Sequence, residues 1–275
     1  MAGTLYLVPT PIGNLGDISR RCAETLEAVD IIAAEDTRVT LKLLNHLGLK
    51  KPLVSYYRHN TDEAGEKLLE RLLAGENVAL VTDAGTPAVS EPAEAPVAPS
   101  PQKGVTVTAL PGPCALVTAL SVSGLPTARF TFEGFLPMNK KNRRAQLEGL
   151  KSEARTMIFY EAPHKLKATL GDLVEIFGPA RRISLCRELT KLHEEIVRTT
   201  LAGAAEEYRA KEPRGEFVLV VEGATPQEVA EATLDDGLRR VKALTAEGLS
   251  KKDAVRQAAK ELGLSKNELY AAALE

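Results

Sequence analysis

Acidic side chains stand directly after several apolar runs of this chain, where the strands of a sheet would end. Glu35 and Asp36 follow one such run, Glu161 follows another, and Glu188 follows a third. A carboxylate held at a sheet edge can act as a general base and take a proton from a reacting hydroxyl. The sequence does not choose among these four candidates.

Basic side chains lie within a few residues of these carboxylates and could pair with a phosphate or a developing alkoxide. They are Arg38, His164, Arg187 and Lys191. Structural interpretations stay open beside the chemical ones. Asp36 stands where a helical pattern begins, which is typical of an N-cap, and His164 follows Pro163, which is typical of a first helical turn.

The apolar run Val78 to Val81 has the character of a buried parallel strand, and the segment Asp83 to Pro87 follows it with a glycine and a proline. In an open α/β sheet, ligands bind beside the loops at the carboxyl ends of the strands. The loop therefore predicts a binding crevice. An ordinary turn is the alternative, since Gly and Pro serve turns equally well.

Similar loops, rich in Gly, Pro and small residues, follow other predicted strands, for example Pro9 to Asn14 and Pro111 to Ala115. Such loops let the backbone approach a ligand closely. The common signatures of other enzyme classes are absent from the sequence: a Walker loop, a G-x-G-x-x-G turn after a strand and an H-E-x-x-H helix, and a G-x-S-x-G elbow.

Composition restricts the class of protein further. The 275 residues are 44% hydrophobic, enough for two α/β domains, and the net charge of −2 gives no general attraction to polyanions. The three cysteines, Cys22, Cys114 and Cys186, have no metal-ligand spacing and form no even set. We expect no metal, no disulfide, no membrane segment and a cytoplasmic location.

Short apolar runs alternate with amphipathic stretches, which predicts an α/β fold with a largely parallel sheet. We expect strands near residues 4–8, 29–34, 52–56, 77–82, 105–110, 156–160, 181–186 and 216–222. Turn residues near 112–126 suggest a boundary, which predicts domains at 1–115 and 116–224 and a helical tail at 225–275.

The tail is expected to contain two short helices, near 250–262 and 265–274, separated by Gly263 as a C-cap. Their lengths would suit a helix-turn-helix, although the pattern alone favours a plain helical hairpin.

A basic cluster follows the apolar run from Phe130 to Leu136. It consists of Lys140, Lys141, Arg143 and Arg144. Several cations at this spacing could contact a phosphate backbone together. A solvated helix start is the alternative.

Taken together, the motifs resemble the tetrapyrrole methylase superfamily, and within it the methyltransferases of small-subunit ribosomal RNA. The resemblance covers nearly the whole chain in the expected order. It is carried by Val8 to Leu15, Ala34 to Arg38, Asp83 to Pro87, Pro111 to Ala115, Glu133 to Pro137 and Arg187 to Lys191.

This resemblance implies two α/β domains with a cofactor cleft between them, S-adenosylmethionine as methyl donor, and a homodimer. The acceptor that it implies is the ribose 2′-hydroxyl of a cytidine in the decoding region of the small subunit (16S) RNA. The implied cofactor contacts are Thr10, Asp83, Ala84, Thr86, Cys114, Ala115, Tyr160 and Leu189. For Cys114 a small buried residue, and for Tyr160 a core aromatic, are the alternatives.

One segment departs from the family pattern. Between Ser90 and Gly104 the chain has four prolines within ten residues, where the family has a turn and an amphipathic helix, and Ala93 stands where a turn glycine is expected. A locally shifted reading frame and a genuine extended loop would both explain it, and resequencing the gene would decide.

Two other functions stay open. A small-molecule methyltransferase of the tetrapyrrole type would share the fold and cofactor without needing the basic cluster or the tail. A non-catalytic ribosome-assembly factor would bind RNA without transferring a methyl group.

Overall fold

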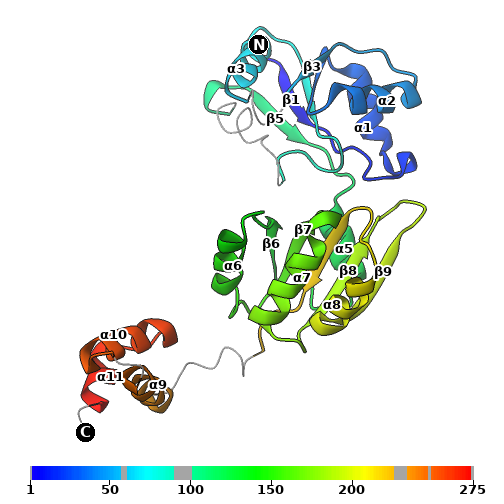
Figure 1. Ribbon diagram of the computed structural model, residues 1–275. Coiled ribbons are helices and arrows are strands. Elements are labelled where there is room, and N and C mark those ends of the chain that lie inside the picture. The colour runs from blue at the N-terminus through cyan, green and yellow to red at the C-terminus, as the bar shows by residue number, and fades with distance from the viewer. Residues whose placement is uncertain (1, 57–60, 90–100, 226–233, 247–248, 274–275) are drawn as a thin grey trace. The chain divides into compact units, whose positions relative to one another are not determined.

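The computed structural model describes residues 2–56, 61–89, 101–225, 234–246 and 249–273. Its first sheet is entirely parallel, with strand order β3-β2-β4-β1-β5 (Figure 1). The strands are β1 (Thr4–Leu7), β2 (Ile31–Ala34), β3 (Leu53–Ser55), β4 (Val78–Val81) and β5 (Thr106–Ala109).

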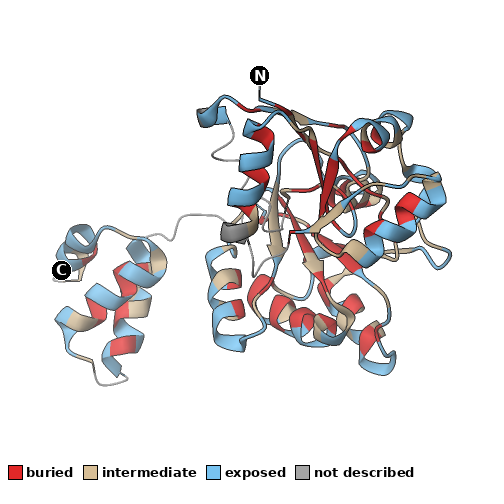
Figure 2. Cartoon of the chain, turned by 90° about the horizontal axis from the view of Figure 1, so that it is seen from above, coloured by how far each residue is buried: buried red, intermediate tan, exposed pale blue. Residues whose placement is uncertain are grey.

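Helices cover both faces of this sheet, which is why β2 and β4 are buried along their whole length. Helices α1 (Arg20–Ala28) and α2 (Thr37–Leu47) pack on one face, and α3 (Thr61–Leu73) packs on the other. Figure 2 shows the buried residues gathered on the strands and on the inward sides of the helices.

The second sheet is mixed, with strand order β6-β7-β10-β8-β9. Its strands are β6 (Phe130–Phe135), β7 (Thr156–Glu161), β8 (Arg182–Arg187), β9 (Glu195–Thr200) and β10 (Phe217–Val221). Only β6 and β7 run parallel; the other neighbours are antiparallel. The expected parallel arrangement is therefore right for the first sheet and wrong for the second. The loop between β8 and β9 is too short for a crossover, and β10 inserts antiparallel between β7 and β8.

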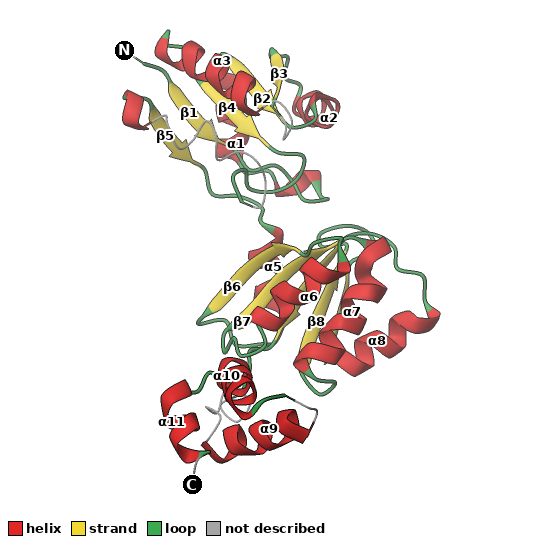
Figure 3. Cartoon of the chain, turned by 60° about the vertical axis from the view of Figure 1, so that its left-hand side comes forward, coloured by secondary structure: helices red, strands yellow, loops and turns green. Residues whose placement is uncertain are grey.

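Helices lie on both faces of the second sheet (Figure 3), and successive side chains of each strand point to opposite faces. One face carries Met157, Phe159 and Leu219 against α6 (Lys140–Gly149), α7 (Pro163–Phe177) and α8 (Leu201–Ala210). The other carries Ile158 and Val220 against α5 (Ala115–Val122). Because side chains alternate between the two faces along a strand, every second residue of β7 and β10 faces α5.

All eight expected strands are present, with each end within two residues of its predicted limit. Strands β6 and β9 were not expected. Both lie at the edges of the second sheet and are only partly buried, so their sequences mix polar and apolar residues.

The tail belongs to a separate unit formed by residues 152–154 and 224–275. It contains α9 (Leu234–Ala246), which was not expected, and the two expected helices, α10 (Lys251–Leu262) and α11 (Lys266–Ala272). Ser250 and Ser265 cap α10 and α11, and Gly263 ends α10 in the left-handed conformation. A small core that includes Val241, Val255 and Leu269 joins the three helices.

Two expectations concern other parts of the chain. Most of the proline-rich departure, residues 90–100, lies outside the described residues, so both explanations of it stand. Among the described helices, none has the length and apolar character that crossing a bilayer requires.

A buried ion pair joins α6 to α7. The guanidinium of Arg143 lies 2.7 Å from the carboxylate of Asp172, and both side chains are 7% exposed. Arg144 also contacts Asp172, at 3.2 Å, and pairs with Glu175, whose side chain is 65% exposed. The two arginines thus fix one helix against the other.

Replacing Asp172 with Asn should lower the free energy of unfolding by about 3 kcal/mol, because it leaves the buried guanidinium of Arg143 without a counter-charge. Urea denaturation measures the change. Glu175→Gln is the matched control and should cost less than about 1 kcal/mol, since that carboxylate is exposed. Equal losses in both variants would contradict a structural role for the buried pair.

Candidate functional site

Loops at the carboxyl edge of the first sheet are bonded to one another. The amide of Thr10 donates to the carbonyl of Gly85 at 2.9 Å, and the amide of Gly85 donates back to Thr10 at 3.0 Å. The Thr10 hydroxyl donates to the carbonyl of Thr82, and the Thr86 hydroxyl donates to that of Pro113, each at 3.0 Å. The loops after β1, β4 and β5 therefore form one connected layer.

A cavity of about 360 Å³ lies against this layer. It is lined by Ile12, Ala84, Gly85, Thr86, Val89, Cys114, Ala115, Phe135, Tyr160, Glu161, Ala162, Pro163, Cys186, Leu189, Lys191, Glu216, Phe217 and Val218. The lining is mostly apolar with few charged groups, which is typical of a small-molecule site. Residues of both sheets contribute to it.

Six of the eight residues predicted to contact a cofactor line this cavity. They are Ala84, Thr86, Cys114, Ala115, Tyr160 and Leu189. Thr10 is buried and supports the loop that holds Gly85. Asp83 is exposed and does not line the cavity; its carboxylate accepts a hydrogen bond from the amide of Asp36 at 3.0 Å.

Glu161 is the predicted base that lines the cavity. Its side chain is fully buried, pairs with Lys165 at 3.0 Å and accepts a hydrogen bond from the hydroxyl of Thr169. Lys165 comes from the first turns of α7, so the helix that follows β7 supplies the counter-charge. This carboxylate is held in one orientation at the cavity wall.

Glu188 does not line the cavity, but its carboxylate anchors a residue that does. It accepts hydrogen bonds from Lys191 at 2.8 Å and from the amide of Glu216 at 3.0 Å. Burial alone would raise the pKa of Glu188, but these two donors outweigh it and hold the pKa below its usual value. Glu188 therefore stays ionised and fixes Lys191 at the cavity.

The remaining carboxylates form a cluster beside the layer of loops. Glu35 accepts a hydrogen bond from the hydroxyl of Thr82 at 3.0 Å. Asp36 is the N-cap of α2, which confirms the structural alternative predicted for this residue. Partial burial, followed by the nearby charge of Glu35, raises the pKa of Asp83. Hydrogen bonds from Arg38 lower the pKa of Asp36 to about 2, which makes Asp36 a weak proton acceptor.

Three non-glycine residues with positive φ angles stand in the loops beside the cavity: Ala88 (65°), Glu188 (50°) and Thr190 (67°). Such conformations cost free energy and persist where surrounding contacts impose them. For Glu188 and Thr190, the bond of Glu188 to Lys191 and the bond of the Thr190 amide to Glu194 supply those contacts.

The predicted cations have different surroundings. Arg38 pairs with Asp36, and Arg187 pairs with Glu195. Lys191 lines the cavity and bonds to Glu188 and Glu216. His164 is exposed in the first turn of α7, after Pro163.

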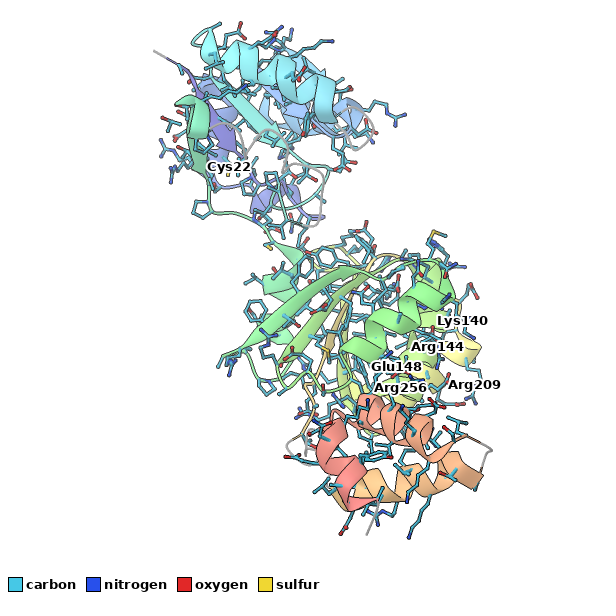
Figure 4. All side chains as sticks on the ribbon, turned by 90° about the vertical axis from the view of Figure 1, so that its left-hand side faces the viewer. Cys22, Lys140, Arg144, Glu148, Arg209 and Arg256 are labelled. Atoms are coloured by element: carbon cyan, nitrogen blue, oxygen red, sulfur yellow. The ribbon has the colours of Figure 1, made fainter. Side chains whose placement is uncertain are left out.

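In the basic cluster, Arg143 and Arg144 belong to the ion pairs with α7, whereas Lys140 and Lys141 are exposed at the start of α6. Figure 4 shows Lys140 and Arg144 on that helix.

Several residues that line the cavity were not predicted, notably Ile12, Phe135, Pro163 and the segment Glu216 to Val218. Ile12 and Phe135 stand in the motifs Val8 to Leu15 and Glu133 to Pro137, which carry the family resemblance but imply no role for either residue. Among the described residues, no group of three or more His, Cys, Asp or Glu side chains is arranged to hold a metal ion.

The comparisons with known proteins agree with this architecture. A family model described as tetrapyrrole (corrin/porphyrin) methylases matches residues 4–205. A solved uroporphyrin-III C-methyltransferase from Thermus thermophilus, complexed with S-adenosyl homocysteine, covers 79% of the chain and 97% of its own, with 19% identity and a TM-score of 0.56. Cobalt precorrin-4 methyltransferase covers 80% and 94%, with 17% identity and a TM-score of 0.60. Fold and cavity thus define a methyltransferase of the tetrapyrrole methylase class, which uses S-adenosylmethionine.

Relatives of higher identity define the family within that class. Ribosomal RNA small subunit methyltransferase I of Synechocystis sp. is 48% identical over 99% of this chain and 98% of its own length. The protein of the same name from Escherichia coli O157:H7 is 47% identical over 99% and 95%. A model described as the RsmI C-terminal HTH domain matches residues 231–275. The chain belongs to the ribosomal RNA small subunit methyltransferase I family, and its tail matches the helix-turn-helix interpretation rather than the plain hairpin.

The opposite pKa shifts of Asp83 and Asp36 predict opposite effects on stability. Asp83 has a raised pKa in the folded state, so its ionisation opposes folding above that pKa; Asp83→Asn should leave the protein at least as stable at pH 7, with the difference vanishing in acid. Asp36 has a lowered pKa, so its ionisation favours folding; Asp36→Asn should be less stable at pH 7, with the loss disappearing between about pH 4 and 2.

Urea midpoints measured from pH 7 to pH 2 test both signs. The same sign for the two variants at pH 7 would contradict the electrostatics of this cluster.

Proposed function

We propose that this protein transfers a methyl group from S-adenosylmethionine to the ribose 2′-hydroxyl of a cytidine in the decoding region of small-subunit ribosomal RNA. Membership of the family over nearly the whole chain, tail included, carries the proposal. A small-molecule methyltransferase would not need the tail, and a non-catalytic factor would not need the cavity.

The cavity suits the methyl donor in its volume and in its lining. Small residues such as Ala84, Thr86 and Ala115 let a ligand approach the backbone closely, and the apolar wall includes Leu189. We propose these residues, with Cys114 and Tyr160, as cofactor contacts. Thr10 and Asp83 support the same wall from outside the lining.

The bound donor supplies an activated methyl group whose sulfur leaves without help from a protein acid. The protein must therefore hold the ribose oxygen in line with the methyl carbon and accept the proton of the hydroxyl. We propose Glu161 as the acceptor, because it is the predicted carboxylate among the residues that line the cavity. Its carboxylate is covered by Thr169 and Lys165, so one of these partners must give its place to the ribose hydroxyl when the RNA binds. Glu35, Asp36 and Glu188 would then act through the loops that they anchor.

We propose that the exposed Lys140 and Lys141, together with His164, contact phosphates of the RNA. Arg38, Arg187 and Lys191 are also proposed to contact phosphates, through N–H groups that their carboxylate partners leave available. Arg143 and Arg144 would position α6 for these contacts. The homodimer, the cytoplasmic location and the domains at 1–115, 116–224 and 225–275 remain part of the proposal.

Mapping 2′-O-methylation on small subunits from a strain that lacks this activity, after incubation with the purified protein and S-adenosylmethionine, tests the function. One new 2′-O-methylcytidine in the decoding region is expected. Methylation of a base, or of a corrinoid precursor in a parallel assay, would contradict the proposal, and binding of RNA without methyl transfer would favour the assembly factor.

Charge reversal at Lys140 and Lys141 together should raise KM for small subunits and reduce the slope of log KM against log salt by about one unit for each lost phosphate contact. The affinity for S-adenosylmethionine, measured by calorimetry, should not change. Lys42→Glu combined with Lys50→Glu, at exposed positions in α2 and just after it, gives the same change of net charge and is the control. An equal effect of the control variant would contradict the assignment of the α6 surface.

A further inference from the structure

An aromatic side chain at the rim of the cavity owes its position to a bulge in β6. Phe132 pairs with Ile158 of β7, and Gly134 pairs with Phe159, so Glu133 is the extra residue between them. Gly134 has a φ angle of 64°, which favours glycine. Bulges change the side to which the following residues point.

The bulge brings two phenylalanines of β6 onto the same tyrosine. Without it, Phe132 and Phe135, three residues apart, would point to opposite faces of the strand. With it, the ring of Phe132 lies 5.0 Å from that of Tyr160, and the ring of Phe135 lies 5.5 Å from it, both in edge-to-face geometry. The ammonium of Lys165 lies 5.5 Å from the centre of the Phe135 ring.

Phe135 is held from two sides and yet is 56% exposed. It lines the cavity that also contains Glu161, to which Lys165 is paired. The exposed ring is thus continuous with the place where methyl transfer is proposed. A core aromatic would be covered, whereas this one offers a fixed apolar surface to a ligand.

We propose that Phe135 stacks on a nucleobase of the RNA substrate and so holds the target nucleotide at the mouth of the cavity. This inference rests on the proposed function. A ribose that enters a concave site takes its base out of the stack, and an unstacked base regains free energy on an aromatic ring.

The exposure of Phe135 favours the RNA over the cofactor as its partner. Tyr160, in the same aromatic group, is only partly exposed and bonds through its hydroxyl to the amide of Leu116. The deeper ring therefore faces the enclosed part of the cavity, and the outer ring faces the solvent from which RNA approaches.

The chain contains six tyrosines but no tryptophan, so Phe135→Trp introduces a single tryptophan at the proposed stacking position, and its fluorescence can be excited separately from that of the tyrosines. Small-subunit RNA should quench this fluorescence at concentrations near KM, and S-adenosylmethionine alone should not. Phe130→Trp is the matched control, since Phe130 is a 40% exposed phenylalanine at the other end of the same strand. Equal quenching in the two variants, or quenching by the cofactor alone, would overturn the proposal.

Kinetics give an independent test. Phe135→Ala should raise KM for small subunits about 5- to 150-fold, the range expected for one base stacked on one aromatic ring, with the affinity for S-adenosylmethionine unchanged. Phe135→Tyr should restore KM, and Phe135→Leu, which keeps apolar area without a ring, should not. Unchanged KM in Phe135→Ala would refute the stacking while leaving the function intact, whereas a wild-type protein that methylates no RNA would refute the function itself.

Discussion

The paired backbone hydrogen bonds between Thr10 and Gly85 are the constraint on which the site depends. Strands β1 and β4 are parallel neighbours, so the loops at their carboxyl ends emerge side by side, and the two bonds join these loops by an antiparallel bridge. Gly85 makes this possible because its φ angle is 94°, a conformation that other residues rarely adopt. Ile12 lies against Gly85, and both form the cavity wall.

How much of the fold could be predicted depended on how fully each strand is buried. Strands β2 and β4 are covered on both faces, so their sequences are continuous apolar runs that stand out. Strands β6 and β9 lie at sheet edges, and a bulge interrupts the alternation in β6. Helix α9 was missed in a tail whose other helices carry clear serine caps, Ser250 and Ser265.

Ligands bind at the carboxyl ends of parallel strands, and the cavity residues that follow this rule were predicted from the sequence. The cavity residues at the amino end of an antiparallel strand were not. The loops after β4 and β5 supply Ala84, Thr86 and Cys114, as that rule expects. Strand β10 is antiparallel, so its first residue, Phe217, lies beside the last residues of β7 and β8. The amino end of β10 therefore reaches the cavity, which a parallel arrangement would have placed at the opposite edge.

Tyr160 contacts both the wall of the cavity at the start of α5 and the aromatic ring of Phe135 at the rim. Helix α5 begins at Ala115 in the cavity wall, and its N-cap, Cys114, makes no side-chain cap hydrogen bond. The amide of Leu116 instead donates to the hydroxyl of Tyr160 at 3.2 Å, which satisfies a donor that the helix leaves without an intrahelical partner. The ring of the same residue supports Phe135 at the rim. Because methyl transfer to a hydroxyl depends chiefly on alignment, a side chain that orders both walls serves the reaction without taking part in its proton transfer.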